Sequence, residues 1–364
     1  MAISKIPSAG TTGFGRRNLI INGAMSVAQR GTSKTGVITS GYYTVDRWKM
    51  NGNNGTWTVG QDTSTPNGFA NSYKMTLTAT EAIGSSSYMS LEQKMEGINL
   101  QSLAYGSSAA KDIILSFWVK SNITGNYCVN TYQDDGSSNY PETYTINTAD
   151  TWEYKTIKYD GNTATSLDND VNSSLRVIFF LVAASELSSG STGSRVAYSA
   201  DTYAAGQSAQ IDAVNDYWQV TGVQLEVGST ATEFEHRSFA EELALCQRYF
   251  EYISPCGVHA HPVWAYTTGG ASTRLYFAVE KRTRAYSAGT EGTFGGSATN
   301  HRIYYNGAYR TFTGFGIAGA TSKAFNSARL DFTGITGVPG GSAAGYYNVG
   351  SDVLTSHVYV DDEL

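Results

Sequence analysis

The sequence is poor in charge and in long apolar runs, and each shortage excludes a class of protein. Charged residues make up 15% of its 364 residues and the net charge is −6, so the chain has no basic footprint for nucleic acid. No apolar run reaches the length of a membrane-spanning helix, and the N-terminus has no apolar core of signal-peptide length. We therefore expect no nucleic-acid partner and no membrane insertion.

Cysteines and reaction motifs are also scarce. Cys128, Cys246 and Cys256 are an odd set without paired spacing, which predicts neither a disulfide framework nor a zinc site. Buried, reduced thiols are the expected state, as in a protein made in a reducing cytosol. The sequence contains no phosphate-binding loop, dinucleotide fingerprint or common hydrolase motif. We expect no enzyme activity and no cofactor.

Glycine and tyrosine are abundant instead. The chain has 39 glycines and 25 tyrosines but only 6 prolines, and its polar residues are mostly Ser, Thr and Asn. A surface of this composition is rigid, nearly neutral and rich in hydrogen-bonding groups, which suits contacts with sugars and proteins. The same composition is typical of any all-β protein with polar loops, since Tyr and Thr favour strands.

Short alternating stretches predict an all-β fold. Strands are expected near residues 56–61, 72–79, 86–97, 111–120, 126–133, 141–146, 152–159, 174–184 and 217–227. Many short antiparallel strands at this spacing predict a sandwich, most simply a jelly roll. The alternation in the last strand slips at Thr221–Gly222, which indicates a bulge. Residues 185–216 are small and polar, and a large surface loop is expected there.

One stretch predicts a helix. Ser238 is a good N-cap, and Glu241 three residues later completes a capping box. Pro255 blocks continuation. An apolar seam with spacings of four, three and four is formed by Phe239, Leu243, Cys246 and Phe250. The seam either packs against copies of itself, as an oligomer interface, or covers the bottom of its own sandwich. Both interpretations stay open.

The chain therefore divides into four parts. Residues 1–16 form an N-terminal docking arm, and residues 17–236 form an antiparallel jelly-roll sandwich. Residues 237–255 form a short linking α-helix, and residues 256–364 form a smaller C-terminal β-sandwich. The second β unit is small enough that association would help to bury its surface.

Candidate glycan-binding residues are aromatic and acidic residues near turns. In the first β unit they are Tyr132, Asp134, Asp135, Tyr140 and Tyr144, and in the second they are Tyr304, Tyr305, Tyr309 and Phe312. Tyrosine rings stack on sugar faces, and carboxylates accept hydrogen bonds from sugar hydroxyls. Any one of these tyrosines can instead pack against a cross-strand neighbour.

Two histidines suggest a speculative metal site. His259 and His261 share one face if they lie on a strand, because side chains alternate. At the axis of a trimer, three such pairs would surround one metal ion. The alternative is two ordinary histidines on a strand surface.

Several segments together resemble one protein family. They are NLIINGAMSVAQRGTS (18–33), GYYTVDRWKM (41–50), LSFWVKSNITGNYCV (115–129), TWEYKTIKYDGNTATSLDND (151–170) and VTGVQLEVGSTATEFEHRSFAEELALCQRYFE (220–251). In this order they resemble tail-fibre and related virion structural proteins of tailed bacteriophages, with marine podovirus members most similar. The resemblance implies a carbohydrate-binding-module-like jelly roll, a homotrimer and a place on the virion surface, after synthesis in the host cytoplasm.

The resemblance also indicates partners. Residues 1–16 would dock on other tail or capsid proteins, and residues 256–364 look like the variable domain that contacts a host-surface glycan. A tail fibre that attaches the particle to its host is the leading hypothesis. A non-binding capsid decoration or tail adaptor protein and a polysaccharide depolymerase are the alternatives. The family offers no defined catalytic motif, so the resemblance assigns no catalytic residue.

Overall fold

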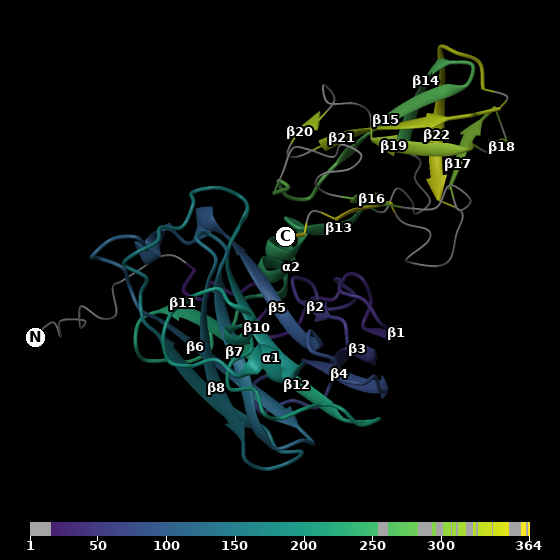
Figure 1. The fold of residues 1–364 in the computed structure, drawn as a ribbon. Coiled ribbons are helices and arrows are strands. Elements are labelled where there is room, and N and C mark those ends of the chain that lie inside the picture. Colours follow the sequence, from purple (N-terminus) through teal and green to yellow (C-terminus); the bar gives the residue numbers. More distant parts are fainter. Residues whose placement is uncertain are drawn as a thin grey trace, which may run out of the picture. The chain divides into compact units, whose positions relative to one another are not determined.

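Two compact units, with their boundary between Ser238 and Phe239, make up the chain (Figure 1). The computed structural model describes residues 16–253, 261–282, 293–295, 301–306, 308–310, 312–317, 323–324, 327–336, 338–348, 358–361 and 363–364. Nearly all regular structure in this part is antiparallel β-sheet, which confirms the predicted all-β class.

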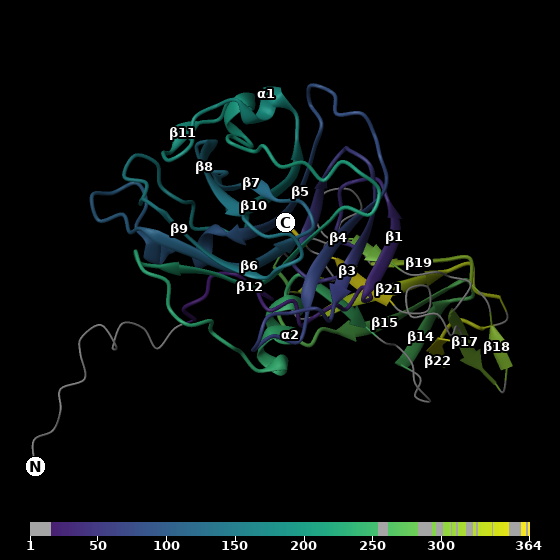
Figure 2. The ribbon, with the colours of Figure 1, turned by 90° about the horizontal axis from the view of Figure 1, so that it is seen from below.

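The N-terminal unit is a jelly-roll sandwich of two described six-stranded sheets. Sheet A has the order β1 (Ser33–Val37), β3 (Thr56–Asp62), β4 (Ser72–Ala79), β12 (Tyr217–Val227), β6 (Ile113–Ser121) and β9 (Glu153–Tyr159). Sheet B has the order β11 (Val196–Ala197), β8 (Ser138–Ile146), β7 (Gly125–Gln133), β10 (Ser173–Ala183), β5 (Tyr88–Glu96) and β2 (Lys49–Gly52). Figure 2 shows the two sheets as separate layers.

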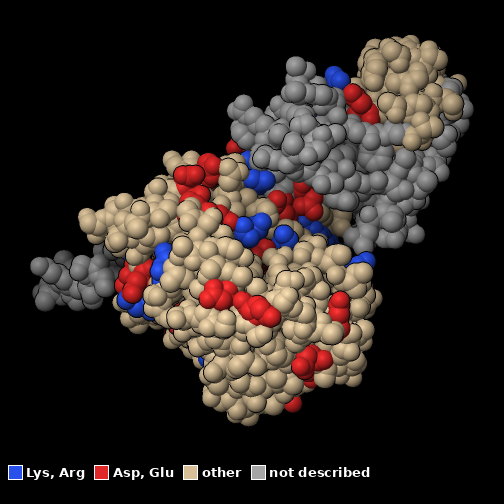
Figure 3. Space-filling model, in the orientation of Figure 1, with Lys and Arg blue, Asp and Glu red and all other residues tan. Residues whose placement is uncertain are grey.

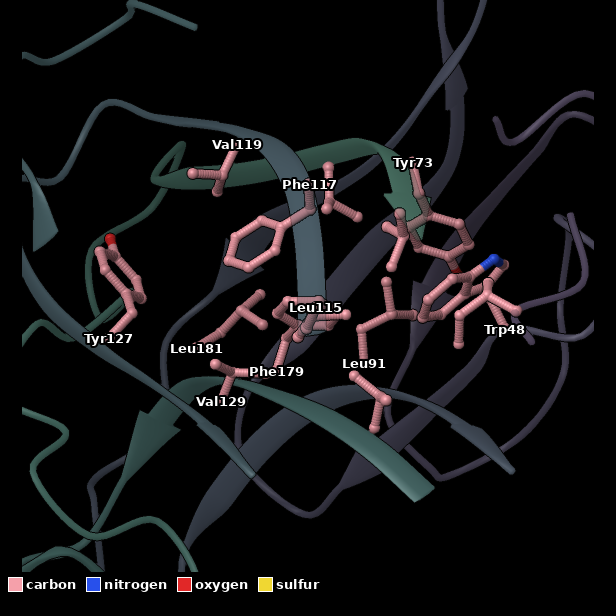
Figure 4. Packing of buried hydrophobic residues seen from close by; sticks show 14 of the residues in the cluster. Trp48, Tyr73, Leu91, Leu115, Phe117, Val119, Tyr127, Val129, Phe179 and Leu181 are labelled. Atoms are coloured by element: carbon pink, nitrogen blue, oxygen red, sulfur yellow. The ribbon is translucent and has the colours of Figure 1, made fainter. Parts of the chain in front are cut away.

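Alternation along the strands builds the core between these sheets. On β6, Leu115, Phe117 and Val119 face inward and are fully buried, because every second side chain of a strand shares one face. Phe179 on β10 meets the ring of Phe117 edge-on, with 5.0 Å between centroids. Figure 4 shows these side chains converging from both layers. The apolar strands β6 and β10 each lie between two neighbouring strands of their sheets.

The outer face of sheet B is also covered. Ile178 and Phe180 of β10 point away from the main core and pack with Leu187 and Ala204. Those two residues belong to the predicted surface loop, which contains α1 (Ser185–Ser188), β11 and the short 3₁₀ helix Ala200–Thr202. Figure 2 shows α1 on the outer side of this sheet. The prediction of a surface loop over residues 185–216 was therefore incomplete. The segment covers β10, an apolar strand that is buried on both faces.

A network of buried hydrogen bonds holds the first residues of the sandwich. Asn22 accepts a hydrogen bond from the Val27 amide and donates to the carbonyls of Val27 and Asp46. Asp46 is fully buried, accepts from the amide of Gln29 and lies 3.8 Å from Arg30. The Asp46 carboxylate therefore belongs to a buried network of hydrogen bonds and charges.

The two ends of the N-terminal unit are fastened together. The carboxylate of Glu235 accepts hydrogen bonds from the backbone amides of Arg17 and Asn18, each at 3.0 Å. Arg237 in turn donates to the carbonyls of Asn18 and Ile20. Charge-assisted bonds of this kind are stronger than neutral ones. Residues 17–20 and 235–237 thus form a clasp at one place on the unit.

The C-terminal unit, in its described part, contains two antiparallel sheets. The smaller has the order β13 (Phe250–Ile253), β23 (Val358–Asp361) and β16 (Thr293–Gly295). The larger has the order β18 (Ala308–Arg310), β17 (His301–Tyr305), β22 (Ser342–Asn348), β14 (His261–Thr267), β15 (Gly270–Tyr276), β21 (Ser327–Thr333) and β19 (Gly314–Ile317), with β20 (Lys323–Ala324) paired to β21.

The predicted linking helix is shorter than expected. Helix α2 spans Phe239–Gln247, so it begins directly after the predicted N-cap Ser238, and strand β13 follows it. Residue Phe250 of the predicted seam therefore lies on a strand. Cys246 and Phe250 are buried, Leu243 is half-buried, and Phe239 is 60% exposed. Only the first half of the seam remains open to a partner.

We predict that truncating a side chain on the buried face of sheet A lowers the free energy of unfolding far more than truncating one on the exposed face. Phe117→Ala should lower the free energy of unfolding by about 3–5 kcal/mol, because it leaves a cavity among fixed neighbours. The control Tyr154→Ala, at a side chain that is 45% exposed, should cost less than about 1 kcal/mol. Urea unfolding followed by tryptophan fluorescence measures both. Equal losses would contradict this assignment of faces.

Candidate functional site

An aromatic pair stands on the outer face of sheet A. Trp118 of β6 is paired in register with Tyr154 of β9, and their ring centroids are 5.3 Å apart. Trp118 follows the buried Phe117 and therefore points to the opposite face of the sheet. It is half-buried, and Tyr154 is 45% exposed. Together they offer two apolar ring surfaces, tilted by 48° to each other, on the outer face of the sheet.

A second aromatic group forms the other side of a pocket. Phe69, Phe234 and His236 contact one another, with ring centroids 4.9–5.3 Å apart. Between this group and the Trp118–Tyr154 pair lies a cavity of about 660 Å³. Its remaining lining residues are Asn67, Gly68, Ser116, Gly222, Ala231, Thr232 and Glu233. We call this cavity the aromatic pocket. Its volume lies within the range of about 300–1,000 Å³ that is typical of ligand sites.

The predicted bulge shapes the floor of the aromatic pocket. The register of β12 against β6 shifts between Thr221 and Gln224, which confirms the bulge. Gly222 adopts a φ of +62°, and a Cβ atom there would come within 2.6 Å of the Phe69 ring. Glycine is thus needed both for the backbone conformation and for the close approach of the ring.

Hydrogen bonds fix the start of β9 and hence Tyr154. The carboxylate of Glu153 accepts from the amides of Asn147 and Thr148 at 2.8 Å and from the ammonium of Lys155. Burial alone would raise the pKa of Glu153, but these hydrogen bonds outweigh it and lower the pKa to about 2. The loop before β9 is therefore tied down next to the exposed aromatic pair.

A second hollow lies elsewhere on the N-terminal unit. It encloses about 560 Å³ and is lined by residues that include Ile38, Asn53 and Glu81. None of its lining residues is aromatic. It therefore lacks the flat ring surface on which a sugar stacks.

Two predicted glycan-binding tyrosines are part of the core. Tyr140 is 4% exposed and Tyr144 is 5% exposed. The Tyr144 ring stacks on Tyr127, and its hydroxyl accepts a hydrogen bond from the indole of Trp218 at 3.0 Å. Neither tyrosine presents a ring face to a ligand, so cross-strand and core packing, the alternative stated above, describes both.

The other predicted residues of this group lie on the outer face of sheet B. Tyr132 is half-buried, and the guanidinium of Arg176 lies 5.2 Å from its ring centroid. Asp134 forms an ion pair with the same arginine and accepts from Ser173. Asp135 accepts a hydrogen bond from the backbone of residue 168. Because Arg176 already occupies one face of the Tyr132 ring, this group is less open to a sugar than the aromatic pocket.

The candidates in the C-terminal unit have mixed outcomes. Phe312 is 6% exposed and packs edge-on against Phe332, so it is a core residue. Tyr304 of β17 and Tyr309 of β18 are register partners, but their side chains and that of Tyr305 lie outside the described part. Among the described residues of the larger sheet of this unit, the exposed aromatic residues are Trp264, Tyr266 and Tyr276. We call these three the C-terminal aromatic patch.

The predicted metal and thiol sites can be placed only in part. His259 lies outside the described residues, and His261 opens β14 with its side chain likewise outside them. Within the described residues, no group of three or more His, Cys, Asp or Glu side chains could hold a metal ion. Cys128 and Cys246 are buried, as predicted, and are not joined to each other in a disulfide, whereas Cys256 falls outside the described part.

No helix in the described part of the chain combines the length and the apolar character that a membrane crossing requires. The surface is largely uncharged. Figure 3 shows small groups of acidic and basic residues separated by broad uncharged areas on the face in view.

Sequence reasoning did not identify the aromatic pocket. The sequence did contain a signal for the Trp118–Tyr154 pair. Alternation places Trp118 opposite the apolar face of its strand and Tyr154 on the solvent-facing side of its strand. Nothing in the sequence indicated that Phe69 and Phe234, which are far apart along the chain, lie together with ring centroids 5.1 Å apart.

The sequence matches no protein-family model, and no curated protein matches it. Solved structures give weak similarities. The enzymatically active domain of tailspike protein 4 of bacteriophage CBA120 is 12% identical, with a TM-score of 0.32 over 58% of this chain and 21% of that chain. The module TmCBM61 in complex with β-1,4-galactotriose is 11% identical, with a TM-score of 0.30 over 58% of this chain and all of that chain.

A third similar structure is a family 11 carbohydrate-binding module from Clostridium thermocellum in complex with a mixed-linked tetrasaccharide. It is 10% identical, with a TM-score of 0.28 over 56% of this chain and 98% of that chain. The chain covers only 21% of the tailspike domain and 27% of a similar α-L-arabinofuranosidase. At these identities and TM-scores, the similarities carry no argument about activity, ligand or assembly.

We predict that Glu153 stabilises the fold in a pH-dependent way. A carboxyl whose folded pKa is about 2, against an ordinary value of 4.5, contributes stability above the ordinary value and loses it as the pH falls toward 2. Glu153→Gln should lower the free energy of unfolding by roughly 1–2 kcal/mol at neutral pH. The difference from the unaltered protein should vanish in strong acid.

Urea unfolding at a series of pH values measures this difference. Glu186→Gln is the matched control, because Glu186 is exposed and bonds only a neighbouring serine among the described residues. It should stay within about 0.5 kcal/mol of the unaltered protein at every pH. A loss at Glu153 that does not change with pH would contradict the prediction.

Proposed function

We propose that the N-terminal unit binds glycan in the aromatic pocket. The observation that carries this proposal is the in-register pair of Trp118 and Tyr154, which is open to solvent at the edge of a 660 Å³ cavity. Aromatic rings fixed on strands offer flat apolar faces to the C–H groups of a sugar ring without loss of conformational entropy. Asn67, Thr232 and Glu233 at the rim supply donors and acceptors for hydroxyl groups.

The chemistry of the pocket favours binding without bond cleavage. Glycoside hydrolysis by the usual route uses two carboxyl groups, which are about 5–10 Å apart across the scissile bond. Of the described residues that line the aromatic pocket, Glu233 alone carries a carboxylate. We therefore propose a binding protein, and we do not favour the polysaccharide depolymerase.

For the whole chain, we propose a structural protein of a phage virion that attaches the particle to a host-surface glycan. The support is the ordered set of segments over residues 18–251 that resembles tail-fibre proteins. Residues 1–16 would dock on another virion protein, and the chain would act as a homotrimer. The open half of the α2 seam, Phe239 and Leu243, is the surface that we assign to contacts between copies.

The C-terminal aromatic patch is a second candidate for receptor contact. On β14, Trp264 is 55% exposed and Tyr266 is 47% exposed. Val263, which precedes Trp264, and Ala265, which lies between the two aromatic residues, are buried. Tyr276 at the end of β15 is 70% exposed. Exposed aromatic residues on one strand face are uncommon without a partner. In this second proposal, the patch contacts the receptor while the aromatic pocket holds glycan.

A glycan array probed with the full chain tests the proposal. We expect binding to a subset of glycans, with Trp118→Ala lowering affinity by about tenfold or more because the ring on which the sugar stacks is lost. The matched variant Trp264→Ala distinguishes the two surfaces and should leave that binding unchanged. Loss with Trp264→Ala alone would assign glycan binding to the C-terminal unit. An array without any bound glycan would contradict the proposed function.

We also predict the oligomeric state. Light scattering at micromolar concentration should give three times the 39.1 kDa mass of one chain. Phe239→Asp should shift the particle toward single chains, because a carboxylate would be buried at the contact between apolar seams. The exposed Phe239 side chain makes no large contribution within its own chain, so the variant should still fold. A single-chain mass for the unaltered protein would refute the trimer.

A further inference from the structure

The described lining of the aromatic pocket includes an acidic side chain but no lysine or arginine. Among the described residues that line it, five carry aromatic rings. The lining contains one carboxylate, Glu233, and one imidazole, His236, which packs against the rings of Phe69 and Phe234. An aromatic ring is electron-rich on its face and attracts a cation that lies within about 6 Å of its centre. The lining therefore suits a positively charged group better than a negative one.

Glu233 differs from the two acidic residues that flank it. The side chain of Glu226 accepts hydrogen bonds from Thr232 and lies 3.4 Å from Arg17. Glu235 accepts from the clasp residues at the start of the unit and pairs with Arg237 at 2.8 Å. The carboxylates of Glu226 and Glu235 are thus already paired with Arg17 and Arg237.

The carboxylate of Glu233 itself has no hydrogen bond or ion pair with any described residue, although its backbone is held. The carbonyl of Glu233 accepts from the guanidinium of Arg17 at 2.6 Å and from the side-chain amide of Gln224 at 3.3 Å. The residue is exposed. A carboxylate without a partner among the described residues, on a residue that lines the same pocket as five aromatic rings, favours an ammonium group as ligand.

We propose that the aromatic pocket selects glycans that carry a positively charged amino substituent. This inference rests on the proposed function and specifies its ligand class. The sugar ring stacks on Trp118 and Tyr154, and the ammonium group lies near Glu233 between the two aromatic walls. A glycan with carboxylate or sulfate groups meets the Glu233 charge without any basic lining residue to compensate it.

A pair of matched oligosaccharides tests this inference by calorimetry with the full chain. One is an N-acetylated β-1,4-glucosamine oligomer, and the other is the N-trimethylated oligomer of the same length, whose charge does not depend on pH. At neutral pH and low salt, we expect the trimethylated oligomer to bind about tenfold more tightly. Added salt should reduce that preference, because an exposed charge is screened.

Two charge-neutralising variants give the matched control. Glu233→Gln should remove most of the preference for the charged oligomer, so that the two oligomers bind with similar affinity. Glu186→Gln removes the same charge from the exposed helix α1, outside the pocket lining, and should leave the preference intact. Both positions are exposed, so both variants should fold, and urea unfolding checks this.

Equal or tighter binding of the acetylated oligomer would overturn the inference and leave glycan binding by the pocket in place. A preference that survives Glu233→Gln would overturn it as well. Binding of neither oligomer would also overturn it, and the glycan array then shows separately whether the proposed function fails too. A preference lost with Glu233→Gln, and kept with Glu186→Gln, supports the inference.

Discussion

The alternation of side chains along β6 is the constraint on which the N-terminal unit depends. Phe117 belongs to the core between the sheets, and its neighbour Trp118 belongs to the aromatic pocket. A slip of one residue in register would exchange the two, placing the indole in the core and the phenyl ring in solvent. The pairings of β6 with β9 and β12 therefore set the stability of the fold and the geometry of the site together.

A local departure from regular sheet geometry completes the site. The bulge in β12 at Gly222 leaves space beside the strand, and Phe69 fills it. A regular strand with a side chain at that position would push the ring away from Phe234 and open the second wall. The pocket is thus made by one regular feature, the cross-strand pair, and one irregular feature, the glycine bulge.

Much of the fold follows from the sequence, because strand periodicity and turn residues act locally. Nine strands of the sandwich, the bulge and the start of α2 were predictable in this way, whereas the short strands β1, β2 and β11 were not among the expected ones. The burial of Tyr144 also had a local signal, since it shares one face of β8 with the buried Ile146. The meeting of Phe69 with Phe234, and the unengaged carboxylate of Glu233, depend on contacts between distant segments and have no local signal.

The clasp between residues 17–20 and 235–237 has a mechanical consequence. Because the entry and exit of the sandwich are joined side by side, a pull between the preceding segment and the C-terminal unit is borne first by the hydrogen bonds of Glu235 and Arg237. The long strands carry little of that load while the clasp holds.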